Sequence, residues 1–75
     1  MDTARMEAAS RRARARLEEL ILGRGDLTFA SVSALLNRNH AYIQQHIVRG
    51  SPRFLAPDDA ERLAHLLAID PAELR

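Results

Sequence analysis

The stretch that decides the fold runs from Leu27 to Gly50 and reads LTFASVSALLNRNHAYIQQHIVRG. It holds two short helical patterns on either side of three residues that suit a tight turn. The apolar residues of the first pattern fall on one helical face, at Val32, Leu35 and Leu36. In the second pattern Ile43 and Ile47 stand four residues apart, which makes one face apolar and leaves the polar residues elsewhere. The stretch therefore predicts two helices joined by a tight turn.

The ends of these two helices follow from the residues that flank the patterns. Thr28 is a suitable N-cap for a helix over residues 29–36, because its hydroxyl can accept a hydrogen bond from an early backbone N–H. Asn37 suits the corner, since asparagine is among the few residues besides glycine that adopt a positive φ. Asn39 can cap a second helix over residues 40–49. That helix should end at the glycine that closes the stretch.

The chain before this stretch has the pattern of one long helix. It is expected to begin after Asp2 or Thr3, to run to about Leu22, and to stop at Gly23 in the left-handed conformation. Its apolar residues form one stripe: Met6, Ala9, Ala13, Leu17, Leu20 and Ile21. Four arginines occupy the remaining surface: Arg11, Arg12, Arg14 and Arg16. They form either a solvated face or a face on which one or two arginines contact phosphate. The start of the helix, within residues 1–16, is expected to project beyond the core or to fray.

The chain after the stretch predicts a further helix and a short last turn. Pro57 suits the first helical position, and Asp58 and Asp59 oppose the positive end of the helix dipole at a solvent-facing start. The buried face of this helix is expected to consist of Ala60, Leu63, Ala64 and Leu67. The sequence DPAE at 70–73 is typical of a capping box that opens a last turn, with Leu74 packing back on the core. We therefore predict an all-α fold, a compact bundle of four to five helices.

Length and composition bound the class of protein. At 75 residues the chain is expected to form one domain. Its length is near the lower limit at which an apolar core stabilises a fold without disulfides or bound metal. The absence of cysteine excludes disulfides and thiolate zinc sites. No apolar run approaches the roughly 20 residues of a membrane span, and charged residues stand where a signal peptide would be apolar. We therefore expect a soluble, cytoplasmic protein.

The charges are unevenly distributed, although the net charge is only +1. Residues 1–25 carry six arginines against four carboxylates, and residues 26–56 carry three arginines against one carboxylate. Residues 57–75 reverse the balance, with two arginines against five carboxylates. The beginning and middle of the chain can therefore face phosphate while its end faces away.

Residues 29–48 resemble the helix-turn-helix of phage-repressor-like regulators, known as the lambda-repressor-like or XRE family. The likeness runs from Leu17 to Leu74, in particular to the N-terminal domain of alphaproteobacterial repressor-type regulators, and rests on the tracts NRNHAYIQQHIVRGSPRFL, DDAERLAHLLAID and PAEL. It implies that the second helix of the motif enters the DNA major groove. Two positions depart from the family pattern: Asn37 stands where glycine is usual, and Arg38 where many members have a small apolar residue.

The family's base-reading positions correspond here to Asn39, His40, Ala41, Gln44 and Gln45. The chemistry of these side chains agrees with that role. A glutamine amide can donate a hydrogen bond to adenine N7 and accept one from the adenine N6 amine. His40 can donate to guanine, and Ala41 can contact a thymine methyl. The alternative for Gln44 and Gln45 is an ordinary solvated surface.

The candidate phosphate contacts are Thr28, Ser31, Arg38, Tyr42, Arg49, Ser51 and Arg53. Short polar and basic side chains in the loop after the second helix suit the phosphate backbone, which positions a protein without reading sequence. That loop has the alternative of being a surface with incidental charge, and Tyr42 has the alternative of packing under the first helix. Arg38 is expected to point outward, and Phe54 and Leu55 to anchor the loop in the core.

Neither a metal site, a cofactor nor catalysis is expected. The histidines show no ligand spacing on one helix and no cysteine accompanies them, so His46 is predicted to be a partly buried, hydrogen-bonded side chain. Capping and the helix dipole already explain the carboxylates near residue 58, and no serine has a partner constellation for nucleophilic catalysis.

The sequence therefore predicts sequence-specific binding of double-stranded DNA by a transcriptional regulator, a repressor by resemblance, acting as a homodimer on repeated half-sites. The alternative is a helical protein–protein interaction module of the antitoxin or adaptor type. The resemblance further implies that the chain is the N-terminal part of a longer regulator with a self-cleaving peptidase domain, and that Leu74 and the exposed side of the last turn are candidates for self-association.

Overall fold

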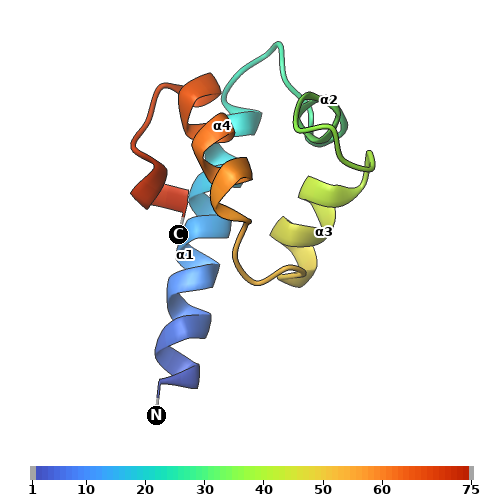
Figure 1. Ribbon diagram of the computed structural model, residues 1–75. Helices are drawn as coiled ribbons and strands as arrows, with labels where there is room; N and C mark the ends of the chain where they lie inside the picture. The colour runs from blue at the N-terminus through green and yellow to red at the C-terminus, as the bar shows by residue number, and fades with distance from the viewer. Residues whose placement is uncertain (1, 75) are drawn as a thin grey trace.

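The computed structural model describes residues 2–74, and in this range all regular secondary structure is helical, with four α-helices and one 3-10 helix (Figure 1). The elements are α1 (Thr3–Leu22), α2 (Phe29–Leu35), α3 (Tyr42–Arg49), α4 (Pro57–Leu67) and η1 (Pro71–Leu74). The N-terminal half of α1 extends beyond the other helices, as Figure 1 shows. The all-α class predicted from the sequence is confirmed. None of these helices combines the length and the apolar character that crossing a membrane requires.

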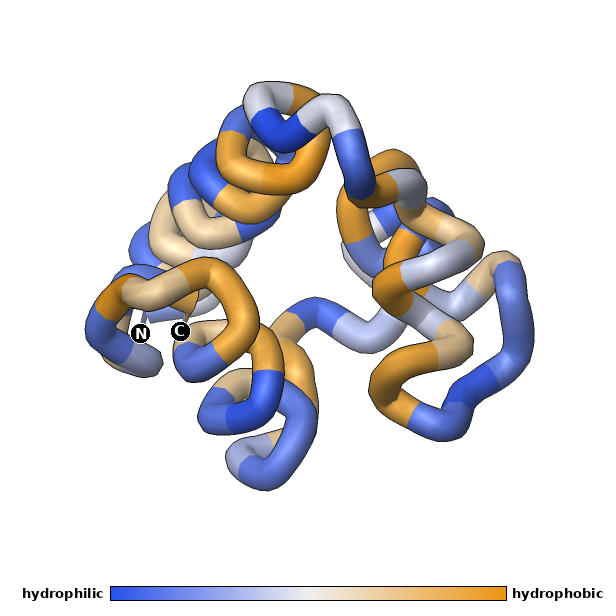
Figure 2. Tube along the Cα trace, turned by 90° about the horizontal axis from the view of Figure 1, so that it is seen from above, coloured by the Kyte–Doolittle hydropathy of each residue, from blue (hydrophilic) through white to orange (hydrophobic). Residues whose placement is uncertain are grey.

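One hydrophobic core receives side chains from every helix. Its buried members are Leu17, Ile21, Val32, Leu36, Ile43, Leu55, Ala60, Leu63, Ala64, Leu67 and Leu74. Hydrophobic and hydrophilic residues alternate around each helix, so that each has one apolar side (Figure 2). The predicted buried face of α4 is confirmed, and so is the packing of Leu74, which is 1% exposed. Because Leu74 is covered by its own chain, it cannot form a self-association surface.

Three apolar residues lie less deeply than predicted. Leu35 is 59% exposed because α2 ends there, and Leu36, in the C-cap position, takes the inward place. Met6 is 47% exposed because it lies on the projecting part of α1. Phe54 is half-buried, whereas its neighbour Leu55 reaches the core. The apolar stripes are therefore shorter than the sequence pattern suggested.

The turn between α2 and α3 has the predicted chemistry. The Thr28 hydroxyl accepts a hydrogen bond from the Ser31 N–H at 3.0 Å, and the Ser31 hydroxyl accepts from the Thr28 N–H at 2.9 Å. Asn37 has φ 60°, the left-handed conformation expected at this corner. The Asn39 side chain accepts from the Ala41 N–H at 2.9 Å. Thr28 and Ser31 therefore define the start of α2. The Asn39 bond stabilises the turn just before α3, whose N-cap, Ala41, has no side-chain cap, so the prediction that Asn39 caps α3 is corrected.

The helix ends include two corrections. α3 begins at Tyr42, two residues later than predicted, because the Tyr42 N–H donates to the Asn39 carbonyl three residues back and makes the first turn tighter than an α-helix. Gly23 ends α1 with φ −73°, a right-handed conformation and not the left-handed one expected. A Cβ at Gly23 would lie 3.0 Å from the Glu19 carbonyl oxygen, so close approach explains the glycine there. Gly50 ends α3 at φ 67°, as predicted.

Ala68 ends α4 in the left-handed conformation, with φ 58°. A Cβ is strained in that conformation, whereas glycine adopts it freely. We expect Ala68→Gly to raise the free energy of unfolding by about 0.5 to 1 kcal/mol, measured by urea denaturation. The matched control is Ala30→Gly, an exposed position inside α2, which should lower the free energy of unfolding by about 1 kcal/mol. The same loss of a methyl group should therefore act with opposite signs at the two positions, and equal signs would contradict the conformational argument.

Candidate nucleic-acid interface

The two sides of α3 are chemically distinct. Ile43 and His46 face the core, at 0% and 1% exposure. Gln44 and Gln45 are exposed on the other side, and within residues 2–74 neither amide makes a side-chain hydrogen bond. They line a shallow depression of about 190 Å³ whose lining consists of Ala41, Gln44, Gln45, Val48 and Arg49. α3 therefore presents an open polar surface formed largely by two free amides.

The five predicted base-reading residues lie on one continuous segment, residues 39–45. Asn39 and His40 are exposed on the turn that leads into α3, and Ala41 is half-buried. The carbonyl oxygen of the Asn39 side chain is occupied by the Ala41 N–H, which leaves its NH₂ group to donate elsewhere. The structure brings Ala41, Gln44 and Gln45 together at one depression and places the other two residues just before it.

A buried serine fixes α3 to α2. The Ser33 hydroxyl accepts a hydrogen bond from the Ile43 N–H at 3.0 Å and donates one to the Phe29 carbonyl at 2.8 Å. Ser33 is 0% exposed, so both bonds are shielded from water. This contact was missed from the sequence, where the only signal is one small polar residue inside an apolar helical pattern.

His46 holds α3 to the loop that follows it. Its Nδ1 lies 2.6 Å from the Pro52 carbonyl oxygen, so the neutral ring donates its Nδ1 proton to that oxygen. Burial is the main cause that lowers the pKa of His46. It outweighs the hydrogen bond to the Pro52 carbonyl, which raises the pKa, and the positive charge of Arg14 adds a smaller lowering effect. The prediction of a buried, hydrogen-bonded histidine is confirmed.

The lowered pKa of His46 makes stability depend on pH. The unfolded chain, with an ordinary histidine pKa of about 6.5, takes up a proton that the folded protein resists. The contribution of neutral His46 to the free energy of unfolding is therefore fully present above about pH 6.5 and is lost as the pH falls below that value. The free energy of unfolding then changes by at most about 1.4 kcal/mol per pH unit. We expect His46→Gln to flatten the free energy of unfolding against pH between about 5 and 6.5, measured by urea titration.

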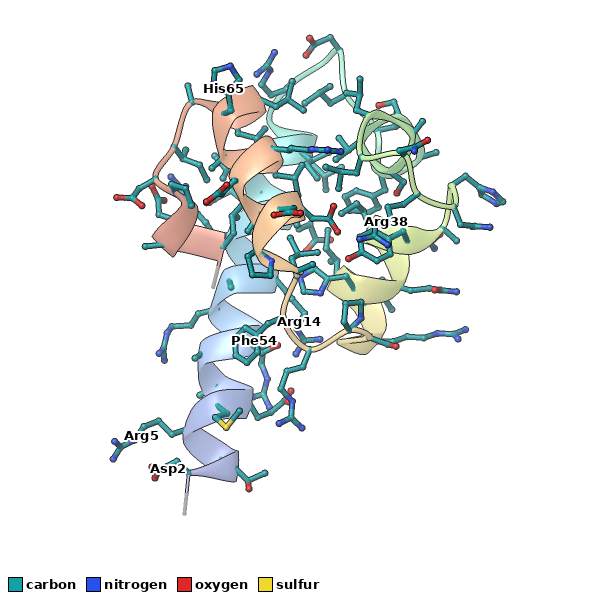
Figure 3. All side chains as sticks on the ribbon, in the orientation of Figure 1. Asp2, Arg5, Arg14, Arg38, Phe54 and His65 are labelled. Carbon is teal, nitrogen blue, oxygen red and sulfur yellow. The ribbon has the colours of Figure 1, made fainter. Side chains whose placement is uncertain are left out.

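Arg38, Tyr42 and Asp59 form an internal polar cluster. The Asp59 carboxylate is 2% exposed and lies 3.0 Å from the Arg38 Nη2, and it accepts a hydrogen bond from the Tyr42 hydroxyl, also at 3.0 Å. The Arg38 guanidinium carbon lies 5.2 Å from the centre of the Tyr42 ring (Figure 3). Burial, and then the bond to Asp59, raises the pKa of Tyr42. Arg38 stays exposed, as expected, with 46% of its side chain accessible, but its charge is paired with Asp59. One expectation is corrected: Asp59 is buried where a solvent-facing residue was predicted.

The other candidate phosphate contacts divide into free and engaged side chains. Arg49 and Ser51 are exposed. The hydroxyls of Thr28 and Ser31 are used in the reciprocal cap of α2. Arg53 lies with its Nε 3.5 Å from Glu7 Oε1. The end of α3 and the loop after it therefore offer two free polar side chains and one that is paired to α1.

Arg14 was expected on the surface, but its side chain is buried, with 9% exposed. Its Nη2 lies 3.0 Å from Glu7 Oε2 and its Nε donates to the Ser10 carbonyl at 3.3 Å. A Cβ on Gly50 would lie 2.7 Å from Arg14 Nη1, so the guanidinium packs directly against the end of α3 (Figure 3). This position suits a cation because the C-terminal end of a helix carries a partial negative charge. Nothing in the sequence distinguishes Arg14 from the other arginines of α1.

The chain matches no protein-family model, no curated protein and no solved structure.

Proposed function

We propose that the chain binds double-stranded DNA in a sequence-specific manner, as a helix-turn-helix formed by α2, the turn and α3, with α3 in the major groove. The observation that supports this most strongly is the division of α3. One side is fixed to the core through Ile43, His46 and Ser33, and the other offers the free amides of Gln44 and Gln45. A rigid helix with unsatisfied amides on its open side is what direct reading of bases requires.

Each residue of the proposed reading face fits a base edge. The amides of Gln44 and Gln45 can both donate and accept, which matches the N7 and N6 positions of adenine. His40 can donate to guanine, and the small Ala41 allows close approach to a thymine methyl. The NH₂ group of Asn39 can donate to an acceptor at the edge of the site, since its carbonyl oxygen is already bound.

Phosphate contacts would position this face on the duplex. Arg49 and Ser51 are exposed beside it, and Arg53 lies on the same loop. The acidic end of the chain, residues 57–75, contributes α4 and η1, and its most deeply buried carboxylate is neutralised internally by Arg38. A weak net charge of +1 is therefore compatible with a basic surface at the loop after α3.

The proposed regulator acts as two copies. One short helix reads only about four base pairs, which is too few for useful specificity. Two copies on half-sites about one helical turn apart would double the length of DNA that is read. A repressor that covers such an operator is the simplest regulator of this design.

A second candidate function is protein–protein interaction, which one surface favours. A groove of about 430 Å³ between α2 and α4 is lined mainly by apolar atoms, and its lining includes the exposed Leu35 and the half-buried Leu66. An antitoxin or adaptor could use such a groove without any DNA. The two functions differ in their response to salt, because only binding to DNA releases condensed counterions.

The proposal is tested by fluorescence anisotropy of a labelled random-sequence duplex at several salt concentrations between 50 and 200 mM. We expect log K to fall linearly with log salt, with a slope of about −0.9 for each phosphate contacted. Binding that does not change with salt, or no binding at 50 mM salt, would contradict the proposal and favour the protein-interaction function.

A further inference from the structure

The middle of α1, from Glu7 to Arg14, lies against the end of α3 and the loop that follows it. The Ser10 hydroxyl is buried and donates a hydrogen bond to the Arg53 carbonyl at 2.7 Å. Arg14 packs against Gly50 at the end of α3. The start of α1 extends beyond the other helices, as expected, but from Glu7 onward the helix is held to the loop that carries the proposed phosphate contacts.

A polar groove of about 480 Å³ runs between residues 7–18 of α1 and the end of α3. Glu7, Arg11 and Glu18 line it from α1, and Val48 and Arg49 line it from α3. Val48 and Arg49 also line the depression that contains Gln44 and Gln45. The groove is therefore continuous with the proposed reading face.

Three arginines converge on one carboxylate at the edge of this groove. Glu7 Oε2 lies 3.0 Å from Arg14 Nη2 and 3.9 Å from Arg11 Nη2, and Glu7 Oε1 lies 3.5 Å from Arg53 Nε. The Arg14 side chain is 9% exposed, whereas those of Arg11 and Arg53 are 73% and 44% exposed. One carboxylate thus pairs with three guanidinium groups, and those of Arg11 and Arg53 are accessible to solvent.

We propose that Arg11 and Arg53 form a phosphate-binding site beside the reading face, and that Glu7 sets its strength by competing with a DNA phosphate for both side chains. This inference rests on the proposed DNA-binding function. Arg14 keeps its contacts with Glu7 and Ser10 and stays structural because it is buried. Arg11 and Arg53 have weak, long contacts to Glu7, so a phosphate oxygen within reach can replace the carboxylate at little cost.

The experiment compares matched pairs of variants on the same random-sequence duplex, by anisotropy at several salt concentrations. Arg11→Gln should make the salt slope shallower by about 0.9, the loss of one phosphate contact. Arg12→Gln removes the same charge from the next residue of α1, which is exposed but outside the lining of the groove, and should leave the slope unchanged.

Glu7→Gln should tighten binding about two- to fivefold at low salt, because it removes the competing carboxylate. Glu18→Gln removes one negative charge from the same groove and should tighten binding by less. Because Glu7 also pairs with buried Arg14, the unfolding transition of each variant is first measured by circular dichroism, and binding is then measured at a temperature below it. The Arg11 and Arg12 variants test the site even where Glu7→Gln weakens the fold.

The outcomes separate the two proposals. If the unchanged chain binds DNA but Arg11→Gln behaves like Arg12→Gln, or Glu7→Gln like Glu18→Gln, the phosphate site is wrong and the DNA-binding function stands. If the unchanged chain does not bind DNA at any salt concentration, both proposals are overturned.

Discussion

Arg38→Met is expected to lower the free energy of unfolding by about 2 to 4 kcal/mol, a large loss for a domain of this size. The reason is the Asp59 carboxylate, which is 2% exposed and would keep only the Tyr42 hydroxyl as a partner. Leaving one charge of a buried pair without its counter-charge costs more than the pair itself contributes. Urea denaturation at pH 7 measures the change.

Two further variants check this explanation of the Arg38 effect. Asp59→Asn should cost only about 1 kcal/mol, because the Arg38 side chain is 46% exposed and can be hydrated when its partner loses the charge. The double variant Arg38→Met with Asp59→Asn should lose much less than the sum of the two single changes. Additive losses would show that Arg38 acts through something other than the buried carboxylate.

Gln44→Ala and Gln45→Ala are each expected to weaken binding to the preferred DNA sequence by about 1 to 3 kcal/mol and to relax the preference at one base pair. Both amides are exposed, so the free energy of unfolding should change by no more than about 0.5 kcal/mol. Binding to the preferred duplex and to duplexes with one changed base pair, measured in parallel, gives the preference at each position.

Arg53→Ala is the matched comparison for the glutamine variants. A phosphate contact carries no sequence information, so this change should weaken binding to all duplexes alike and make the salt slope shallower. If the glutamine and arginine variants behave in the same way, the assignment of reading and positioning roles is wrong.

The elements that were predicted well depend on neighbouring residues. The N-cap at Thr28, the left-handed Asn37 and the end of α3 at Gly50 all follow from short-range chemistry, which the sequence displays directly. The buried face of α4 follows from its helical periodicity.

The features that were missed depend on contacts between distant segments. Nothing in the sequence around Arg14 shows that its guanidinium packs against the end of α3. Asp59 has the sequence position of a carboxylate that stabilises a helix N-terminus, and only the fold shows that it also pairs with Arg38. Ser33 is a single polar residue in an apolar pattern, and its partner, the Ile43 N–H, is ten residues away. Periodicity cannot find such contacts, because it describes one helix at a time.

The candidate site could be predicted only in part, because only some of its residues are neighbours in the sequence. Segment 39–45 is continuous, so its exposed residues could be named from helical spacing and turn chemistry. The pairing of Arg53 with Glu7 joins residues on α1 and on the loop after α3, and only the fold brings them together.

Selection of bound duplexes from a pool of random sequences, carried out with the unchanged chain, tests the proposed function most directly. We expect the selected sequences to share a motif of about four base pairs that occurs twice, with its two copies about one helical turn apart. A pool that enriches no common motif, although the chain remains folded, would contradict sequence-specific binding by α3.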